Sequence, residues 1–210
     1  MLKLLLPQGH LQVGVLSLLS KAGIEFTFKD PRDYRPQCSD PRIEAKVLRP
    51  QDTPWLLAQG RHDFGFCGLD LLDEKAATGL EGFVECIDTR LNPVKLVLAA
   101  HWQDKDILSQ SERRLLIATE YPFTAARWAA SRGIDALAIP TAGCTEAWVP
   151  DDADLILDVT ETGTTLRKNG LVVVSQILRS TTHLVASKKA AIDHAWFINL
   201  VASAVLQQQA

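Results

Sequence analysis

Residues 154–171, Asp-Leu-Ile-Leu-Asp-Val-Thr-Glu-Thr-Gly-Thr-Thr-Leu-Arg-Lys-Asn-Gly-Leu, combine a strand pattern, a loop and a possible helix start in one stretch. The apolar run Leu155–Val159 is typical of a buried strand, and it opens into the hydroxyl-rich loop Thr162–Thr165. If a helix follows at Leu166, its positive end adds to the same loop. The stretch therefore predicts a strand–loop–helix unit of an α/β protein, with a loop suited to anions.

This stretch also carries the residue types that a ribose phosphate needs. Consecutive backbone N–H groups, three hydroxyls and Gly163, which lets an anion approach the main chain, suit a phosphate. The carboxylates of Asp154, Asp158 and Glu161 suit sugar hydroxyls or a bound Mg²⁺. The alternative is a plain strand–turn–helix junction that Thr162 caps.

The composition limits the classes of partner. The chain has 210 residues, of which 47% are hydrophobic and 22% charged, so it can bury a sizeable core. A net charge of −3 argues against a general nucleic-acid binder. No apolar run approaches the roughly 20 residues that span a bilayer, and the apolar start is too short for a signal peptide. We therefore expect a cytoplasmic protein with neither a nucleic-acid nor a membrane partner.

The four cysteines and five histidines are scattered and show no metal-ligand spacing. Free thiols are expected, and no metal site.

Short β-type runs alternate with helical patterns along the chain. The helix-like stretches are Leu11–Leu19, Thr53–Gln59, Phe123–Ser131 and Ala190–Leu206. Such alternation predicts an α/β fold with a mainly parallel sheet. The strand-like runs are Leu2–Leu6, Lys46–Arg49, Phe64–Cys67, Leu96–Ala100, Leu115–Ala118, Leu155–Val159 and His183–Ala186.

Two turn-rich places, Asp88–Pro93 and Arg179–Thr182, are candidate crossings between two lobes. If the chain crosses at both, residues 1–92 plus 181–210 form a discontinuous first lobe. Residues 93–180 then form a second lobe, which carries the predicted phosphate loop. A cleft between lobes is a common place for a ligand.

Six blocks of sequence, in the right order and over nearly the whole chain, resemble the ATP phosphoribosyltransferase family. They are LPQGHL at Leu6–Leu11, LRPQDTP at Leu48–Pro54, HDFGFCGLD at His62–Asp70, IATEYP at Ile117–Pro122, GCTE at Gly143–Glu146, and the stretch Asp154–Leu171.

The resemblance implies a two-lobed fold like that of type II periplasmic binding proteins, with a cleft between the lobes. Because the chain ends at Ala210, it resembles the short form, which has no C-terminal regulatory domain. That form implies a homodimer that assembles with a histidyl-tRNA-synthetase-like regulatory subunit. The implied reaction is the first step of histidine biosynthesis. In it, N1 of ATP attacks the anomeric carbon of phosphoribosyl diphosphate, and pyrophosphate leaves with Mg²⁺.

The resemblance also assigns roles to single residues. By this resemblance the 5-phosphate is bound by Glu161, Thr162, Gly163, Thr164 and Thr165, and the ribose hydroxyls are bound by Asp158. Arg49 and Arg35 are cationic candidates for the diphosphate or the ATP phosphates. The other candidates are Gly68 and Asp70 on the nucleotide side, Glu146 in the GCTE block, His10 in the first turn, and the acid Asp154.

Three positions depart from the family pattern. Gln8, His10 and Glu120 stand where the family usually has basic residues. An enzyme with altered kinetics explains these changes, and so does a paralogue that binds a nucleotide without turnover. Two rival classes stay open as well: a nucleobase phosphoribosyltransferase, and a binding module of the periplasmic type. The intact loop favours the enzyme.

Overall fold

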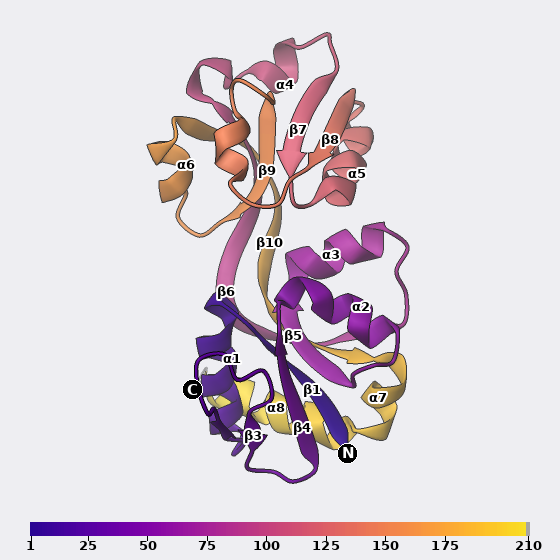
Figure 1. The fold of residues 1–210 in the computed structure, drawn as a ribbon. Helices are drawn as coiled ribbons and strands as arrows, with labels where there is room; N and C mark the ends of the chain where they lie inside the picture. The colour runs from indigo at the N-terminus through magenta and orange to yellow at the C-terminus, as the bar shows by residue number, and fades with distance from the viewer. Residues whose placement is uncertain (209–210) are drawn as a thin grey trace. The chain divides into compact units, whose positions relative to one another are not determined.

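The computed structural model describes residues 1–208 and divides the chain into two compact units (Figure 1). The first unit contains Met1–Leu72, Gly79–Asn92 and the chain from Thr181 onward, and the second contains Asp73–Thr78 and Pro93–Ser180. The lobes predicted from the sequence differ from this division at Asp73–Thr78. Residues 209 and 210, which the prediction included in the first lobe, lie outside the described residues.

In the first unit, three neighbouring strands of the sheet run parallel. Strand β1 lies between β4 and β5, with Leu2 opposite Ile43 and Leu4 opposite Phe64. Strand β10 then pairs with β5 in the antiparallel direction. The elements of this unit are β1 (Leu2–Pro7), α1 (His10–Lys21), β2 (Phe26–Thr27), β3 (Gln37–Cys38), β4 (Ile43–Leu48), η1 (Pro50–Asp52), α2 (Thr53–Ala58), β5 (Phe64–Gly68), the first half of α3 (Leu69–Ala77), parts of β6 (Phe83–His101) and β10 (Leu171–Ser187), α7 (Lys188–Asp193) and α8 (Ala195–Gln207).

Apolar side chains cover both faces of this sheet. Residues at alternate positions of β1 and β5, such as Leu4 and Phe64, pack with Val15 of α1 and Phe197 of α8. A smaller cluster joins α2, β5, the start of α3 and β10 through Leu57, Cys67, Leu72 and Val185. The sheet of the first unit therefore has helices on each side, an arrangement typical of the α/β class that the strand and helix patterns predicted.

The second unit has the same α/β character. Strand β9 lies between β6 and β7, antiparallel to the first and parallel to the second, and β7 is parallel to β8. Its core contains Val97, Ala118, Ile156 and Leu166. The elements are the rest of α3, β6 and β10, together with η2 (Trp102–Asp104), α4 (Ile107–Gln110), β7 (Leu115–Thr119), α5 (Pro122–Arg132), β8 (Ala136–Pro140), η3 (Thr145–Trp148), β9 (Leu155–Thr160) and α6 (Thr164–Lys168).

One predicted helix is wrong in its length. The stretch Ala190–Leu206 is divided into α7 and α8 at His194, whose backbone is not helical (φ −126°, ψ 37°). The buried residues of α8, such as Phe197 and Val201, repeat at helical spacing, whereas α7 buries Ala190 alone. The change of direction at His194 therefore lets α8 keep its own apolar stripe on the core.

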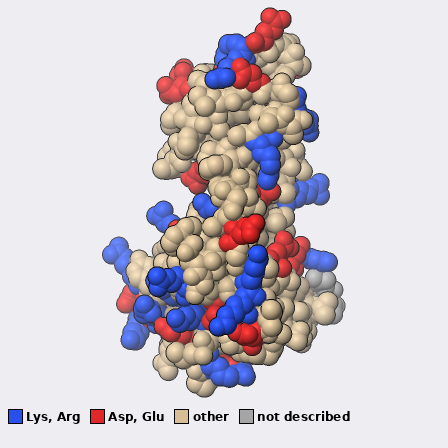
Figure 2. All heavy atoms as spheres, turned by 90° about the vertical axis from the view of Figure 1, so that its right-hand side faces the viewer, with Lys and Arg blue, Asp and Glu red and all other residues tan. Residues whose placement is uncertain are grey.

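Charge on the surface is mixed in sign. On the face shown in Figure 2, lysine and arginine side chains are interspersed with acidic ones, in keeping with the net charge of −3. Within residues 1–208, no helix is long and apolar enough to span a membrane.

The second half of α3 supplies hydrogen-bond acceptors for the backbone N–H groups at the start of α5. The carboxylate of Glu74, a residue that is only 4% exposed, accepts hydrogen bonds from the backbone N–H groups of Phe123 (3.0 Å) and Thr124 (2.8 Å). The first N–H groups of a helix have no partner inside it. Asp73 adds contacts to the Thr124 hydroxyl and to Arg127.

Glu74→Gln is expected to lower the free energy of unfolding by about 1–2 kcal/mol, because the amide keeps one acceptor and turns an N–H₂ toward the second backbone donor. Urea unfolding of the whole chain measures this effect. The matched control is Glu81→Gln, at an exposed acid outside these contacts, which should change stability by less than about 0.5 kcal/mol. Equal stability of the two variants would contradict the capping role.

Candidate functional site

The sequence-predicted residues of the second unit gather at one edge of its sheet. Strands β7, β8 and β9 are parallel, so their carboxyl ends lie at the same edge. Glu120 follows β7, the GCTE block with Glu146 follows β8, and the loop from Glu161 to Thr165 follows β9. Ligands of open α/β sheets bind outside the carboxyl ends of the strands.

The predicted phosphate loop is a tight turn into a helix. Thr160 Oγ1 accepts a hydrogen bond from the N–H of Gly163 at 2.9 Å, and Gly163 has the left-handed conformation (φ 71°, ψ 12°) directly before α6. The hydroxyls of Thr162 and Thr164 lie 2.8 Å apart. Both threonines are exposed, as are Glu161 and Thr165, so the hydroxyls are open to a ligand.

Asp158 lies near the end of β9, two residues before the loop begins to turn. Its carboxylate accepts a hydrogen bond from the N–H of Val159 at 2.7 Å. Burial, together with the neighbouring charges of Glu146 and Glu120, raises the pKa of the Asp158 carboxyl to about 6, while hydrogen bonds from Val159 and Thr145 act in the opposite direction. Glu120 also lies near the GCTE turn, since its Oε1 is 3.8 Å from where a Cβ would stand on Gly143.

The structure does not bring Asp154 to this group. Asp154 precedes the first residue of β9, and six residues of strand place it about 20 Å from Thr160. Its carboxylate pairs with the Arg113 guanidinium and accepts a hydrogen bond from the N–H of Leu116 at 2.8 Å. The side-chain hydrogen bond of Arg113 holds the pKa of Asp154 below its usual range. The expectation that Asp154 contacts substrate is corrected: this acid anchors the opposite edge of the sheet.

In the first unit, four predicted residues share a second carboxyl edge. Strands β1, β4 and β5 are parallel and end at Pro7, Leu48 and Gly68, with Pro7 directly opposite Leu48. These ends are followed by His10 at the start of α1, by Arg49 before η1, and by Asp70 in the first turn of α3. His10 and Arg49 are exposed, whereas Gly68 and Asp70 are buried.

Arg35 is not brought to the side chain of Arg49. Its loop is held near the end of β4, because the carbonyl of Tyr34 accepts a hydrogen bond from the N–H of Val47 at 3.0 Å. The guanidinium, however, contacts the Glu44 carboxylate at 3.2 Å, in the first half of β4. Both side chains of that pair are largely exposed, so the pair contributes little to stability. The predicted phosphate contact of Arg35 has no support from this position.

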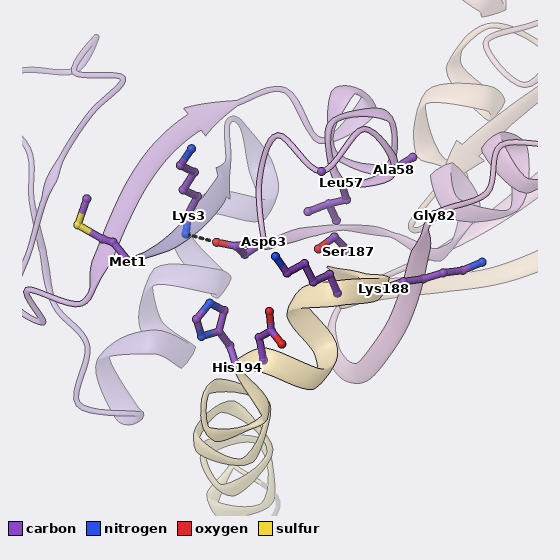
Figure 3. Close-up of a pocket in the computed structure, with 12 residues that line it drawn as sticks. Met1, Lys3, Leu57, Ala58, Asp63, Gly82, Ser187, Lys188 and His194 are labelled. Atoms are coloured by element: carbon purple, nitrogen blue, oxygen red, sulfur yellow. Dashed lines mark hydrogen bonds between the residues drawn. The ribbon is translucent and has the colours of Figure 1, made fainter.

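A separate hollow lies at the other edge of the first unit. It encloses about 410 Å³ between the start of β1, the end of α2 and the start of α7, and Figure 3 shows its walls. Asp63 accepts a hydrogen bond from the backbone N–H of Lys3 at 2.7 Å there. None of the predicted site residues lines this hollow. Over the described part of the chain, no group of three or more His, Cys, Asp or Glu side chains has the arrangement of a metal site.

Comparison with known proteins gives the family. A family model described as ATP phosphoribosyltransferase matches residues 49–206. The chain belongs to this family. It is 36% identical over 190 residues to an ATP phosphoribosyltransferase from Pelotomaculum thermopropionicum, an alignment that covers 90% of this chain and 65% of that protein. The chain thus spans slightly less than two thirds of that relative.

Solved structures give the fold. A chain of the ATP phosphoribosyl transferase (HisG:HisZ) complex from Thermotoga maritima superposes with a TM-score of 0.82 and 28% identity, covering 99% of this chain and 100% of that one. The alkanesulfonate-binding protein SsuA from Xanthomonas axonopodis pv. citri matches with a TM-score of 0.56 and 13% identity, covering 98% and 72%. The predicted fold, α/β in two lobes of the type II periplasmic-binding-protein kind, is confirmed.

Sequence reasoning missed one residue that contacts the predicted phosphate loop. Arg167, in α6, donates hydrogen bonds to the carbonyl of Thr162 and to the hydroxyl of Thr164. A signal was present, because a side chain three residues after Thr164 on a helix returns to the same face.

Proposed function

We propose that this chain transfers the phosphoribosyl group of phosphoribosyl diphosphate to N1 of ATP, the first step of histidine biosynthesis. The observation that carries the proposal is the Thr162–Thr165 loop beside the Asp158 carboxylate at one sheet edge, in a chain of the ATP phosphoribosyltransferase family. The loop suits a phosphate and the acid suits ribose hydroxyls. A cytoplasmic location belongs to the same proposal.

In the second unit, each group has a part in holding the phosphoribosyl donor. The loop binds the 5-phosphate through main-chain N–H groups and threonine hydroxyls, with Glu161 at its start. Asp158 accepts hydrogen bonds from the ribose hydroxyls, and Glu146 lies close enough to influence its charge. Fixing the ribose at these points orients the anomeric carbon for attack.

The bond changes need no covalent intermediate. N1 of ATP donates an electron pair to the anomeric carbon, the bond from that carbon to the diphosphate oxygen breaks, and pyrophosphate leaves with the Mg²⁺ that entered with it. Stabilising the leaving charge is the protein's main electrostatic task. In the first unit, Arg49 is the proposed cationic group, His10 is a proposed hydrogen-bond donor to the diphosphate, and Gly68 and Asp70 are the proposed nucleotide contacts.

The partners are part of the proposal. The similar chain from Thermotoga maritima comes from a HisG:HisZ complex. We extend this to a homodimer of the present chain that assembles with a histidyl-tRNA-synthetase-like regulatory subunit.

One assay tests the function. The purified chain is mixed with ATP, phosphoribosyl diphosphate and Mg²⁺, with and without a candidate regulatory subunit, and pyrophosphate release is followed. Release that requires ATP supports the proposal. Release with free adenine in place of ATP would indicate a nucleobase phosphoribosyltransferase. Binding of both substrates without release, in the presence of the regulatory subunit, would indicate a non-catalytic paralogue.

His10→Arg is expected to raise kcat/KM at pH 8 several-fold. His10 is exposed at the carboxyl end of β1, where the family usually has an arginine. Arginine keeps its positive charge at every pH of the assay, and this charge stabilises the leaving diphosphate. Rates of both proteins across pH 6–9 measure the effect.

The control for this variant is Ser17→Arg, which adds the same charge two turns further along α1. It should leave kcat/KM unchanged. A His10→Arg rate that is equal to or below that of the wild type over the whole range would remove His10 from the site.

A further inference from the structure

The guanidinium of Arg167 lies directly on the phosphate loop. Its Nη1 donates a hydrogen bond to the carbonyl of Thr162 at 3.0 Å, and its Nη2 donates one to the hydroxyl of Thr164 at 3.2 Å. A Cβ on Gly163 would stand 3.1 Å from the same Nη1. The arginine therefore spans the residues on both sides of the glycine where a phosphate would approach the main chain.

These contacts of Arg167 use acceptors of the loop and none of its donors. A phosphate needs N–H and O–H donors, because its own oxygens are acceptors. Arg167 bonds to a carbonyl and to a hydroxyl oxygen, so it takes neither the backbone N–H groups nor the hydroxyl hydrogen of Thr164. Its remaining N–H donors have no acceptor among residues 1–208.

The charge of Arg167 is also not neutralised. Several other arginines pair with carboxylates, as Arg113 does with Asp154 and Arg127 with Asp73. Arg167 forms no ion pair with any described acid, although Glu161 is six residues away and exposed. A cation fixed by two hydrogen bonds beside an anion loop, without a counter-ion, is arranged for a ligand that brings the negative charge.

We propose that Arg167 is a ligand of the 5-phosphate of phosphoribosyl diphosphate, and that it supplies the positive charge of the phosphate loop. The inference rests on the proposed function and deepens it. The planar guanidinium places paired donors toward two phosphate oxygens, which a single ammonium group cannot do. The adjacent Lys168 is exposed, and its side chain makes no hydrogen bond or ion pair with the described residues, so it is the matched comparison.

The test is calorimetric binding of phosphoribosyl diphosphate with Mg²⁺ to the whole chain and to three variants. Arg167→Met is expected to weaken binding about tenfold. Lys168→Met, which removes the same charge one residue later, should stay within twofold of the wild type. Arg167→Lys should bind at least threefold more tightly than Arg167→Met, because it restores the charge. The weakening of binding by added salt should be smaller for Arg167→Met than for the wild type.

Two results would overturn the proposal while the proposed function stands. In one, Arg167→Met binds as well as Lys168→Met. In the other, Arg167→Lys and Arg167→Met bind phosphoribosyl diphosphate equally weakly, and their binding has the salt dependence of the wild type. The arginine would then stabilise the loop without contacting the phosphate. If the wild type itself does not bind phosphoribosyl diphosphate, the proposed function fails, and this inference fails with it.

Discussion

Gly163→Val is expected to reduce the affinity for phosphoribosyl diphosphate by roughly 100-fold or more, since at least two charge-assisted hydrogen bonds are lost at about 1.5–3 kcal/mol each. Gly163 has φ 71°, a conformation that a β-branched residue adopts only with strain. The new side chain would also meet Nη1 of Arg167, which lies 3.1 Å from the Cβ position. Both effects change the loop at the point where we propose that the phosphate binds.

A second glycine separates loss of binding from loss of stability. Gly133 ends α5 with φ 66°, and a Cβ there would meet no atom within 4 Å. Gly133→Val therefore carries similar backbone strain, away from the loop. The midpoint temperature of thermal unfolding should fall by similar amounts in both variants. Calorimetry should show normal phosphoribosyl diphosphate binding for Gly133→Val alone. Binding by Gly163→Val within about threefold of the wild type would remove the loop from the site.

The strands were predictable because apolar runs reveal them directly. Runs such as Leu2–Leu6 and Leu155–Val159 are strands with buried residues in the structure. The break at His194 was not predictable in the same way. No glycine or proline marks it, and only the packing of α8 on the first core makes the change of direction favourable.

Part of the site also followed from sequence, because parallel strands place their following loops at one edge. This rule brings the GCTE block and the Thr162–Thr165 loop together. It also explains the error for Asp154. Asp154 and Asp158 lie within one apolar stretch, but a strand separates its two ends, and the contact with Arg113 crosses 41 residues of sequence.

Contacts between residues distant in sequence were not accessible to pattern reading. Glu74 caps α5 across about 50 residues, and nothing in the LDLLDEKAA stretch marks it as a cap. The contact of Arg35 with Glu44 depends on the path of an irregular loop. Arg167 was within reach, since α6 follows the loop directly, but the resemblance to the family assigned the phosphate to Glu161–Thr165 alone.

For Asp158, the sequence predicted the position and the fold supplies the environment. Its place before the loop was read from sequence, whereas its burial and its neighbours Glu146 and Glu120 come from the fold. These raise the pKa of Asp158 from an ordinary value of 3.8 to about 6. Because the folded pKa is raised, the ionised carboxylate costs stability above that pH, and stability falls as the pH rises from 3.8 through about 6. A carboxylate kept at such a cost is typical of a binding role.

Asp158→Asn is expected to weaken phosphoribosyl diphosphate binding at pH 8 by roughly 30- to 100-fold, or about 2–3 kcal/mol, because the ribose hydroxyls lose a charged acceptor. Wild-type affinity should fall as the pH drops through about 6, where the Asp158 carboxyl takes up its proton, and the variant should show a smaller fall, which comes from protonation of the 5-phosphate, whose second pKa is also about 6.

The stability of Asp158→Asn at pH 8 should not fall with its affinity, since the variant no longer buries an ionised group. Its unfolding midpoint should equal or exceed that of the wild type. Asp154→Asn is the matched control, because it breaks the contact with Arg113 at the opposite end of β9. It should lower stability and leave the affinity within about threefold of the wild type. If Asp154→Asn weakens binding as much as Asp158→Asn does, the loss of affinity reflects damage to β9, and Asp158 has no direct contact with the ribose.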